Sequence, residues 1–103
     1  MIGATVTMRV NPGKIGEFER LYRQLAEQVR SREEGNFQYE LFRSADDPNT
    51  YKTMEQYRDH AAIEAHLRTE HIKRLGPALS ALLVEEPVIE IVGDKVVFKQ
   101  GGR

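Results

Sequence analysis

The chain of 103 residues lacks cysteine entirely. Disulfide bridges, thiolate catalysis and cysteine-ligated metal sites are therefore excluded. The glycine-rich sequences that hold nucleotides are also absent, because no Gly-x-Gly-x-x-Gly follows a strand and Gly13-Lys14-Ile15-Gly16 has neither that spacing nor the Walker spacing. We expect no nucleotide or flavin site built into this chain.

An excess of charge of one sign is lacking as well. The sequence has 15 Lys plus Arg against 16 Asp plus Glu, and the two signs alternate along the chain. Nucleic acid and anionic membranes attract proteins through a clustered basic surface, so neither is expected as a partner. No apolar run approaches the roughly 20 residues of a membrane span. We take a cytoplasmic location as the default expectation.

The length predicts a single domain over residues 1–103, with a core at about 2–92 and a C-terminal strand and tail at 93–103. A core this small leaves a monomer only modestly stable, because little of the chain's surface is buried on folding. Stabilisation by a second copy is therefore expected.

Two periodicities organise the first third of the chain. Residues Ile2 to Val10 alternate between apolar and polar, which indicates a half-buried strand. After Asn11-Pro12-Gly13 the period changes to that of a helix about five turns long. Its apolar stripe consists of Ile15, Phe18, Leu21, Tyr22, Leu25 and Val29. Gly35-Asn36 is expected to end this helix, with the glycine in a left-handed conformation.

Two further strands are predicted at Phe37 to Ser44 and Thr50 to Tyr57, joined by a loop dense in turn formers. Both carry apolar groups on both faces: Phe42 lies opposite Phe37, Tyr39 and Leu41, and Met54 lies opposite Tyr51 and Tyr57. A sheet with one face in water would be polar on that side. We therefore expect helices to cover one face and something outside the monomer to cover the other.

The remainder predicts a second helical region and closing strands. Asp59 is the expected N-cap of a helix through Leu67, and a second helical stretch, which Gly76-Pro77 must kink or restart, follows. Val88 to Val92 and Lys95 to Lys99 are expected strands, and Gln100 to Arg103 a frayed tail. The order β-α-β-β-α-β is that of an α+β, ferredoxin-like fold. Two-fold pairing of sheets would cover the open face.

Several short segments, in this order and spacing, resemble one family: the antibiotic biosynthesis monooxygenase domain of the dimeric α+β barrel superfamily. The matching segments span about Ile2 to Ile91 and are Val10 to Lys14 with Glu17-Phe18, Glu33 to Asn36 followed by Tyr39, Asp46 to Pro48 before Tyr51, Glu55, Tyr57, and Ala65 to His71.

The resemblance implies a homodimer in which two sheets form a barrel and each subunit keeps a pocket between sheet and helices. Similar proteins include quinol monooxygenases, oxygenases of polyketide phenols that use neither flavin nor metal, and an isomerase of a phosphorylated autoinducer. Relatives that degrade haem carry other residues at the positions of Val6, His66 and Gly76. No metal, haem or other cofactor is therefore expected.

Two histidines, His66 and His71, are the candidate catalytic residues. Histidine exchanges protons near neutral pH, so one of them is expected to act as a general base on a phenolic or enediol hydroxyl. In an unbroken helix the two would face about 140° apart. If the helix breaks near Thr69, both rings would line one pocket mouth. The alternative is a structural role, with His66 packed as a semi-buried polar residue and His71 bonded to a helix end; His60 is expected to be exposed.

The expected pocket wall consists of Val6, Met8, Ile63, Leu67 and Leu79. Tyr39, Tyr51 and Tyr57 would bind a flat ring by stacking or hydrogen bonding, or would simply fill the strand surface. Glu55 either holds an imidazole in one tautomer or pairs with an arginine across the dimer, and we favour the arginine, with Arg9 and Arg43 as candidates. The charges at Glu27, Arg30, Arg32, Glu33 and Glu34 are interpreted as a solvated face.

The leading hypothesis is a cofactor-independent monooxygenase that oxidises a quinol or polyketide-type phenol with O2. The first alternative is an isomerase of a small phosphorylated hydroxyketone, a branch to which Glu33-Glu34-Gly35-Asn36 is slightly more similar. The second is a dimeric module that binds a ligand without catalysis. The partners expected are thus a second copy and a small aromatic or hydroxyketone substrate.

Overall fold

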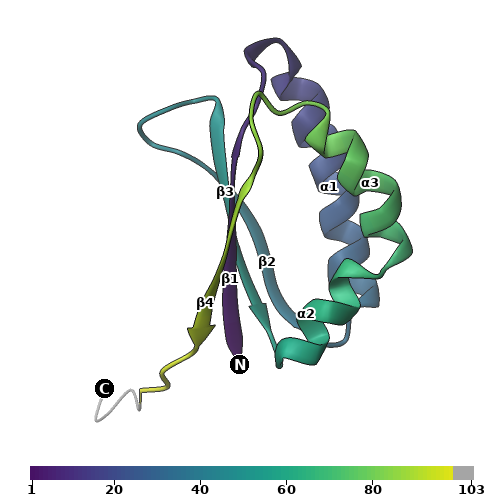
Figure 1. Cartoon of the computed structure of the whole chain (residues 1–103), viewed down its shortest axis with the longest axis vertical. Coiled ribbons are helices and arrows are strands. Elements are labelled where there is room, and N and C mark those ends of the chain that lie inside the picture. The colour runs from purple at the N-terminus through teal and green to yellow at the C-terminus, as the bar shows by residue number, and fades with distance from the viewer. Residues whose placement is uncertain (99–103) are drawn as a thin grey trace.

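The computed structural model describes residues 1–98. A four-stranded antiparallel sheet, in the order β2-β3-β1-β4, carries the helices on one face (Figure 1). The elements are β1 (Ile2–Arg9), a 3-10 turn (Pro12–Lys14), α1 (Ile15–Arg32), β2 (Asn36–Arg43), β3 (Thr50–Tyr57), α2 (His60–Leu67), α3 (Glu70–Ser80) and β4 (Val88–Asp94). This is the predicted α+β ferredoxin-like fold. None of the helices within residues 1–98 has the length and apolar composition needed to cross a membrane.

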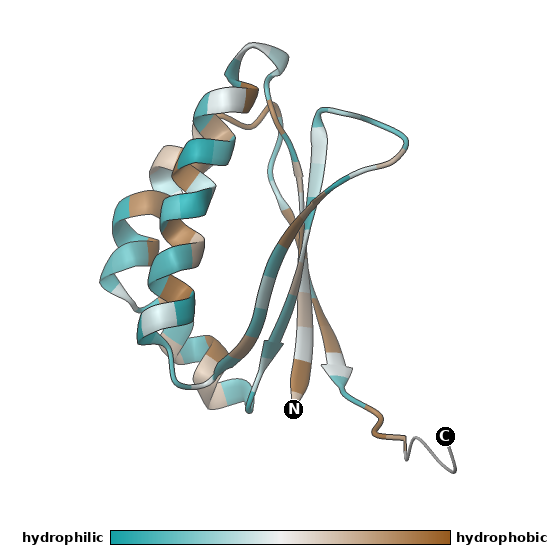
Figure 2. Cartoon of the chain, turned by 180° about the vertical axis from the view of Figure 1, so that it is seen from behind, coloured by the Kyte–Doolittle hydropathy of each residue, from teal (hydrophilic) through white to brown (hydrophobic). Residues whose placement is uncertain are grey.

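Helix α1 packs its apolar stripe on the sheet. Phe18, Tyr22, Leu25 and Val29 are buried, as the helical period predicted. Bands of hydrophobic and hydrophilic residues alternate along the helices in Figure 2, which is the pattern of a helix with one buried side. The main core forms where this stripe meets the inward-facing residues of β1, β2 and β3 and the buried side of α3.

The end of α1 differs from the prediction. Glu33 is the C-cap residue, with extended backbone, and among residues 1–98 only Gly93 has a positive φ. The expected left-handed conformation of Gly35 is therefore wrong. Glycine is needed there for another reason: a Cβ at position 35 would lie 2.5 Å from the Cβ of Ala62 in α2. The absence of a side chain lets the α1–β2 connection contact α2 closely.

Two capped helices replace one long helix after β3. The Asp59 carboxylate accepts from the backbone N–H of Ala62 at 2.9 Å, and the Thr69 hydroxyl accepts from Ile72 at 3.3 Å. The predicted Asp59 cap is confirmed, and Thr69 caps a new helix, so the chain does break at Thr69. Helix α3 then runs through Pro77 without the predicted restart. The break places His66 and His71 on different helices.

The far end of the chain also departs from expectation. Residues 95–98 are not a strand, so the predicted strand at Lys95 to Lys99 is wrong over its described part; Lys99 and the tail Gln100 to Arg103 lie outside the described residues. The segment after β4 leads away from the sheet, and Val96, Val97 and Phe98 are exposed (Figure 2). Phe37, expected beside Tyr39, is exposed because the register of β2 shifts between Asn36 and Gln38.

The sheet face opposite the helices keeps apolar side chains in solvent. Phe42 and Met54 are 48% and 45% exposed, and Val88 and Val92 on the edge strand β4 are 65% and 60% exposed. The expected apolar groups on both faces are therefore present.

Candidate active site

A cavity of about 250 Å³ lies between the sheet and the helices. Its wall comes from all four strands on one side and from α1, α2 and α3 on the other. Seven of the eight side chains expected to bind substrate line it: Val6, Met8, Tyr39, Tyr57, Ile63, Leu67 and Leu79. The wall is mostly apolar, and its ionisable members are Tyr22, Tyr39, Glu55, Tyr57 and His66.

Tyr51 is the exception among the expected substrate-binding residues. Its ring packs 4.9 Å from that of Phe18, centroid to centroid, and its hydroxyl donates to the Glu19 carboxylate at the surface. Arg43 lies over the same ring at 5.6 Å. Tyr51 is thus drawn toward α1 and away from the cavity, so we reassign it to the packed core.

His66 is buried in the cavity wall. Its ring lies 5.6 Å from the ring of Tyr39 and 5.4 Å from that of Tyr57, both tilted. Nδ1 lies 2.9 Å from each oxygen of the Glu33 carboxylate. Among the described residues no buried side-chain nitrogen or oxygen lacks a partner. Since Nε2 bonds no group in that same part of the chain, it lies where a ligand or water can reach it.

His71 does not line this cavity. Its Nε2 lies 2.5 Å from Oε2 of the same Glu33 carboxylate, and its ring borders a separate hollow near Gln28, Arg32 and Arg74. The two imidazoles thus meet at Glu33 and do not both line the pocket mouth. His60 is exposed, as expected.

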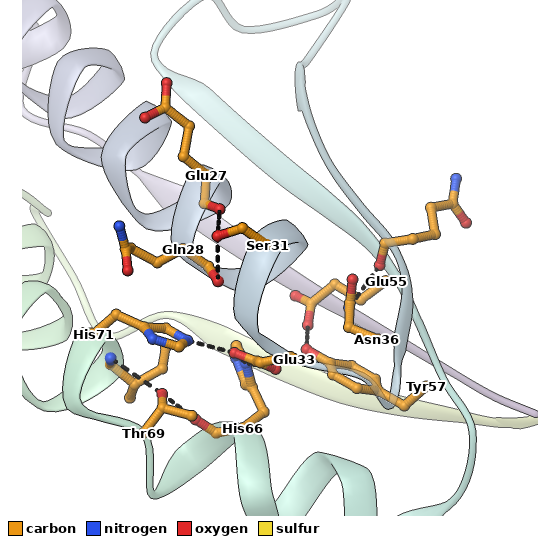
Figure 3. A network of polar contacts seen from close by, with 12 residues as sticks. Glu27, Gln28, Ser31, Glu33, Asn36, Glu55, Tyr57, His66, Thr69 and His71 are labelled. Atoms are coloured by element: carbon orange, nitrogen blue, oxygen red, sulfur yellow. Dashed lines mark hydrogen bonds and ion pairs between the residues drawn. The ribbon is translucent and has the colours of Figure 1, made fainter.

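The interpretation of the charges at the end of α1 as a solvated face is wrong for Glu33. Its side chain is only 9% exposed, and it receives both imidazoles (Figure 3). Burial raises the pKa of this carboxyl, but the hydrogen bonds from His66 and His71 and the positive charge these rings can carry lower it further, so that the net pKa lies below the ordinary 4.5. Glu33 is therefore an ionised carboxylate at neutral pH.

Glu33, His66 and His71 also form a donor set that a metal ion could use, because their ligand atoms lie within 4.8 Å of one another. Two ligands at the usual zinc–nitrogen distance, about 2.0–2.1 Å from one tetrahedral ion, stand about 3.3 Å apart. The separations here, 2.9 and 2.5 Å, are those of hydrogen bonds. The arrangement fits protons between these groups better than a metal.

Glu55 bonds two hydroxyl groups within its own subunit. The hydroxyl of Tyr57 donates to Oε1 and that of Thr53 to Oε2, each at 2.6 Å. Arg9 and Arg43 instead pair with Glu85 and Glu19. Glu55 is 7% exposed, and among residues 1–98 no cation bonds it. Two hydroxyl donors therefore hold this carboxylate at the cavity wall.

The three cavity tyrosines keep their protons at neutral pH. Burial raises the pKa of Tyr22, Tyr39 and Tyr57 above the ordinary 10, and the nearby Glu55 carboxylate raises those of Tyr39 and Tyr57 further. The hydroxyl of Tyr57 already donates its hydrogen to Glu55, and none of the three tyrosines is a base at neutral pH.

Sequence reasoning missed Glu33 and Tyr22 as site residues. Tyr22 was assigned only to the apolar stripe of the helix, but its side chain belongs to both the core and the cavity wall. A signal for Glu33 was present: it follows Val29 by four residues and so continues the buried stripe of α1. An acid on an apolar stripe requires a polar partner inside the fold.

Comparison with known proteins agrees with this fold. A family described as "Antibiotic biosynthesis monooxygenase" matches residues 1–76. A protein of Bacillus subtilis (strain 168) named "Putative monooxygenase YcnE" is 36% identical over 73 residues, which are 71% of this chain and 76% of that protein.

Solved structures give the same result. One from Caulobacter crescentus CB15, described as a putative antibiotic biosynthesis monooxygenase, has a TM-score of 0.88 at 34% identity and covers 92% of this chain and 90% of its own. A conserved protein from Methanosarcina mazei Go1 has a TM-score of 0.87 at 30% identity, covering 91% and 92%. The sequence match over three quarters of the chain and these superpositions together show that the chain belongs to the antibiotic biosynthesis monooxygenase family.

Proposed function

We propose that the protein is a monooxygenase that oxidises a quinol or polyketide-type phenol with O2 and needs no flavin, metal or haem. Family membership and the name of the Bacillus subtilis relative support the reaction class. The observation that carries the proposal is an apolar cavity with one imidazole in its wall, His66, whose second ring nitrogen bonds no group among residues 1–98. A volume of about 250 Å³ is just below the roughly 300–1,000 Å³ of common ligand pockets, which favours a small ligand.

Three observations support His66 as the base in this proposal. The tyrosines of the wall hold their protons, and each oxygen of Glu55 already accepts a hydroxyl. His71 lines a different hollow. Nε2 of His66 is thus the group best placed to remove a proton from a phenolic hydroxyl.

The reaction balances without an added reductant. Proton removal makes the ring electron-rich, and the resulting anion transfers an electron to O2; the two radicals then combine, forming a carbon–oxygen bond. Cleavage of the O–O bond with loss of the ring C–H proton leaves a new carbonyl and releases one water. The substrate supplies all four electrons: one C–H carbon and one C–OH carbon become carbonyl carbons, so that a phenol gives a quinone and a quinol gives a hydroxyquinone. The apolar wall shields the anion and the radical from water.

The cavity suits a neutral aromatic better than a phosphorylated hydroxyketone. Among residues 1–98, no lysine or arginine lines it, whereas phosphate recognition relies on such cations or on clustered backbone N–H groups. The flat rings of Tyr39 and Tyr57 beside His66 offer stacking surfaces for an aromatic ligand. We therefore favour the oxygenase over the isomerase.

The functional unit in this proposal is a homodimer. Ile89 and Ile91 of β4 belong to the cavity wall yet are 65% and 45% exposed, so the cavity is not closed along this edge. Together with the exposed apolar groups on the open sheet face, they form a surface that a second copy would cover. Sedimentation equilibrium should give twice the chain mass of 11.8 kDa; a monomer at micromolar concentration would contradict this part of the proposal.

A panel of hydroquinones and anthrones, assayed with an oxygen electrode, tests the function. We expect substrate loss with one O2 consumed per turnover under air and none under nitrogen. His66→Ala should lower kcat by about 10²–10⁴-fold, the usual contribution of a general base. The exposed His60→Ala is the matched control and should be unchanged. Turnover that persists without O2 would indicate an isomerase, and binding without turnover a ligand-binding module.

A further inference from the structure

The carboxylate of Glu33 lies between two imidazoles that belong to two different helices (Figure 3). Nδ1 of His66, on α2, lies 2.9 Å from both carboxylate oxygens, and Nε2 of His71, on α3, lies 2.5 Å from Oε2. The side chains of His66, Glu33 and His71 are 8%, 9% and 6% exposed, respectively. Water competes little for these contacts, so their protons are confined to the three groups.

Each of these contacts has a defined direction. An ionised carboxylate only accepts hydrogen bonds, so the ring nitrogen that faces it must carry the hydrogen. The net lowering of the Glu33 pKa by its two neighbours keeps the carboxylate ionised. His66 is then protonated on Nδ1 and His71 on Nε2. Neutral imidazole carries one proton, so Nε2 of His66 presents a lone pair.

The same proton count excludes a relay from His66 to His71. A relay would require the carboxylate to pass a proton to Nε2 of His71, which already carries one. The two rings also line different places: His66 lines the cavity and a hollow beside Arg58 and Ala61, whereas His71 lines the hollow beside Arg32 and Arg74. His71 cannot therefore reach a ligand in the cavity directly.

We propose that Glu33 and His71 are positioning residues that fix His66 as the Nδ1–H tautomer, with Nε2 as the base facing the cavity. Glu33 orients the His66 ring and compensates the charge that the ring gains when it takes a proton. His71, through its hydrogen bond, holds the carboxylate in place. This inference rests on the proposed function for its catalytic part, whereas the tautomers are a property of the protein without substrate.

The first test measures tautomers without any substrate. Long-range ¹H–¹⁵N NMR spectra of the ¹⁵N-labelled full-length protein should show Nδ1–H for His66 and Nε2–H for His71. Glu33→Gln removes the negative charge that selects these two tautomers and leaves one acceptor oxygen in place of two, so the population of the Nδ1–H tautomer of His66 should fall. An Nε2–H tautomer of His66 in the wild-type protein, or unchanged tautomers in Glu33→Gln, would overturn the proposal.

The second test separates positioning from acid–base chemistry at His71. The amide nitrogen of glutamine can replace Nε2 as a donor to Glu33, but glutamine is not a base. His71→Ala should lower kcat by about 3–10-fold with little change in KM, and His71→Gln should recover most of the loss. Equal losses in both variants would show that His71 itself exchanges protons and would overturn its assignment as a positioning residue.

The two tests fail independently of the proposed function. If no quinol is oxidised by the wild-type protein, the proposed function fails while the NMR spectra still decide the tautomers. If Glu33→Gln does not fold, as checked by circular dichroism, the wild-type NMR spectra and the comparison of His71→Ala with His71→Gln still test the proposal. Titration with Zn²⁺ is the last measurement. Micromolar binding that Glu33→Gln and His71→Ala both abolish would show a metal site and would overturn the assignment of Glu33 and His71 as positioning residues.

Discussion

Two regions on the same side of the sheet are filled differently. Beneath α1, Phe18 and Val29 are fully buried, and the aromatic rings of this helix and of the strands contact one another directly. Beneath α2 and α3, where β1 and β4 form the floor, the side chains leave a cavity whose wall includes the exposed Leu67 and Ile89. One region is packed at the density of a protein interior and stabilises the fold. The other leaves space between its side chains, so the residues that stabilise the fold and those of the proposed binding site belong to different parts of one small core.

The largest expected effect is a loss of stability in the packed region. Phe18→Ala removes a fully buried ring and should lower the free energy of unfolding by about 3–5 kcal/mol, measured by urea denaturation. Leu67→Ala, at a wall residue that is 59% exposed, should cost less than about 1 kcal/mol. Equal losses for the two variants would show that the regions do not differ in packing.

A matched substitution to a larger residue sharpens the comparison. Val29→Phe has no space to enter and should destabilise the fold by about 1–3 kcal/mol through overpacking. Val6→Phe points the same ring into the cavity, so its cost should be well under that of Val29→Phe. The affinity for any quinol that the wild-type protein oxidises should nevertheless fall at least tenfold. Retained affinity in Val6→Phe would place the binding site elsewhere.

The smallest expected effect depends on pH. The pKa of Glu33 is lowered in the folded state, so its ionised form stabilises the fold above the ordinary value of 4.5. This contribution is lost as the pH falls from 4.5 through the lower folded-state value. At pH 7, Glu33→Gln should be less stable by about 1–2 kcal/mol, since a charged acceptor is replaced by a neutral one. Urea denaturation from pH 7 to pH 3 should show the difference shrinking; a constant difference would contradict the assignment.

Local patterns predicted most of the fold. Alternation over Ile2 to Val10 and the helical stripe from Ile15 depend only on which side of an element faces the core, and both are present. Predictions from single residue types were less reliable. Gly35 was assigned a turn conformation, whereas the glycine is required by a contact with Ala62, 27 positions later in the chain. No local pattern contains such a contact.

The candidate site was predicted in part for the same reason. The apolar wall was found because its members are core residues of regular elements. The partner of the histidines was not found, because Glu33 is 33 positions from His66 and stands in a run of charges. Its place on the buried stripe of α1 was the available signal, and that signal becomes decisive only when the fold brings α2 against the end of α1.

The close approach of Gly35 to Ala62 makes the geometry of this site depend on the size of two uncharged residues. The carbon chain of a larger residue at either position would push α2 outward, and Glu33 is only two residues before Gly35. The distance between carboxylate and imidazole would then lengthen although no ionisable group had been altered. In the proposed site, the contact between Glu33 and His66 could therefore be weakened by changing the size of a residue without changing any charge.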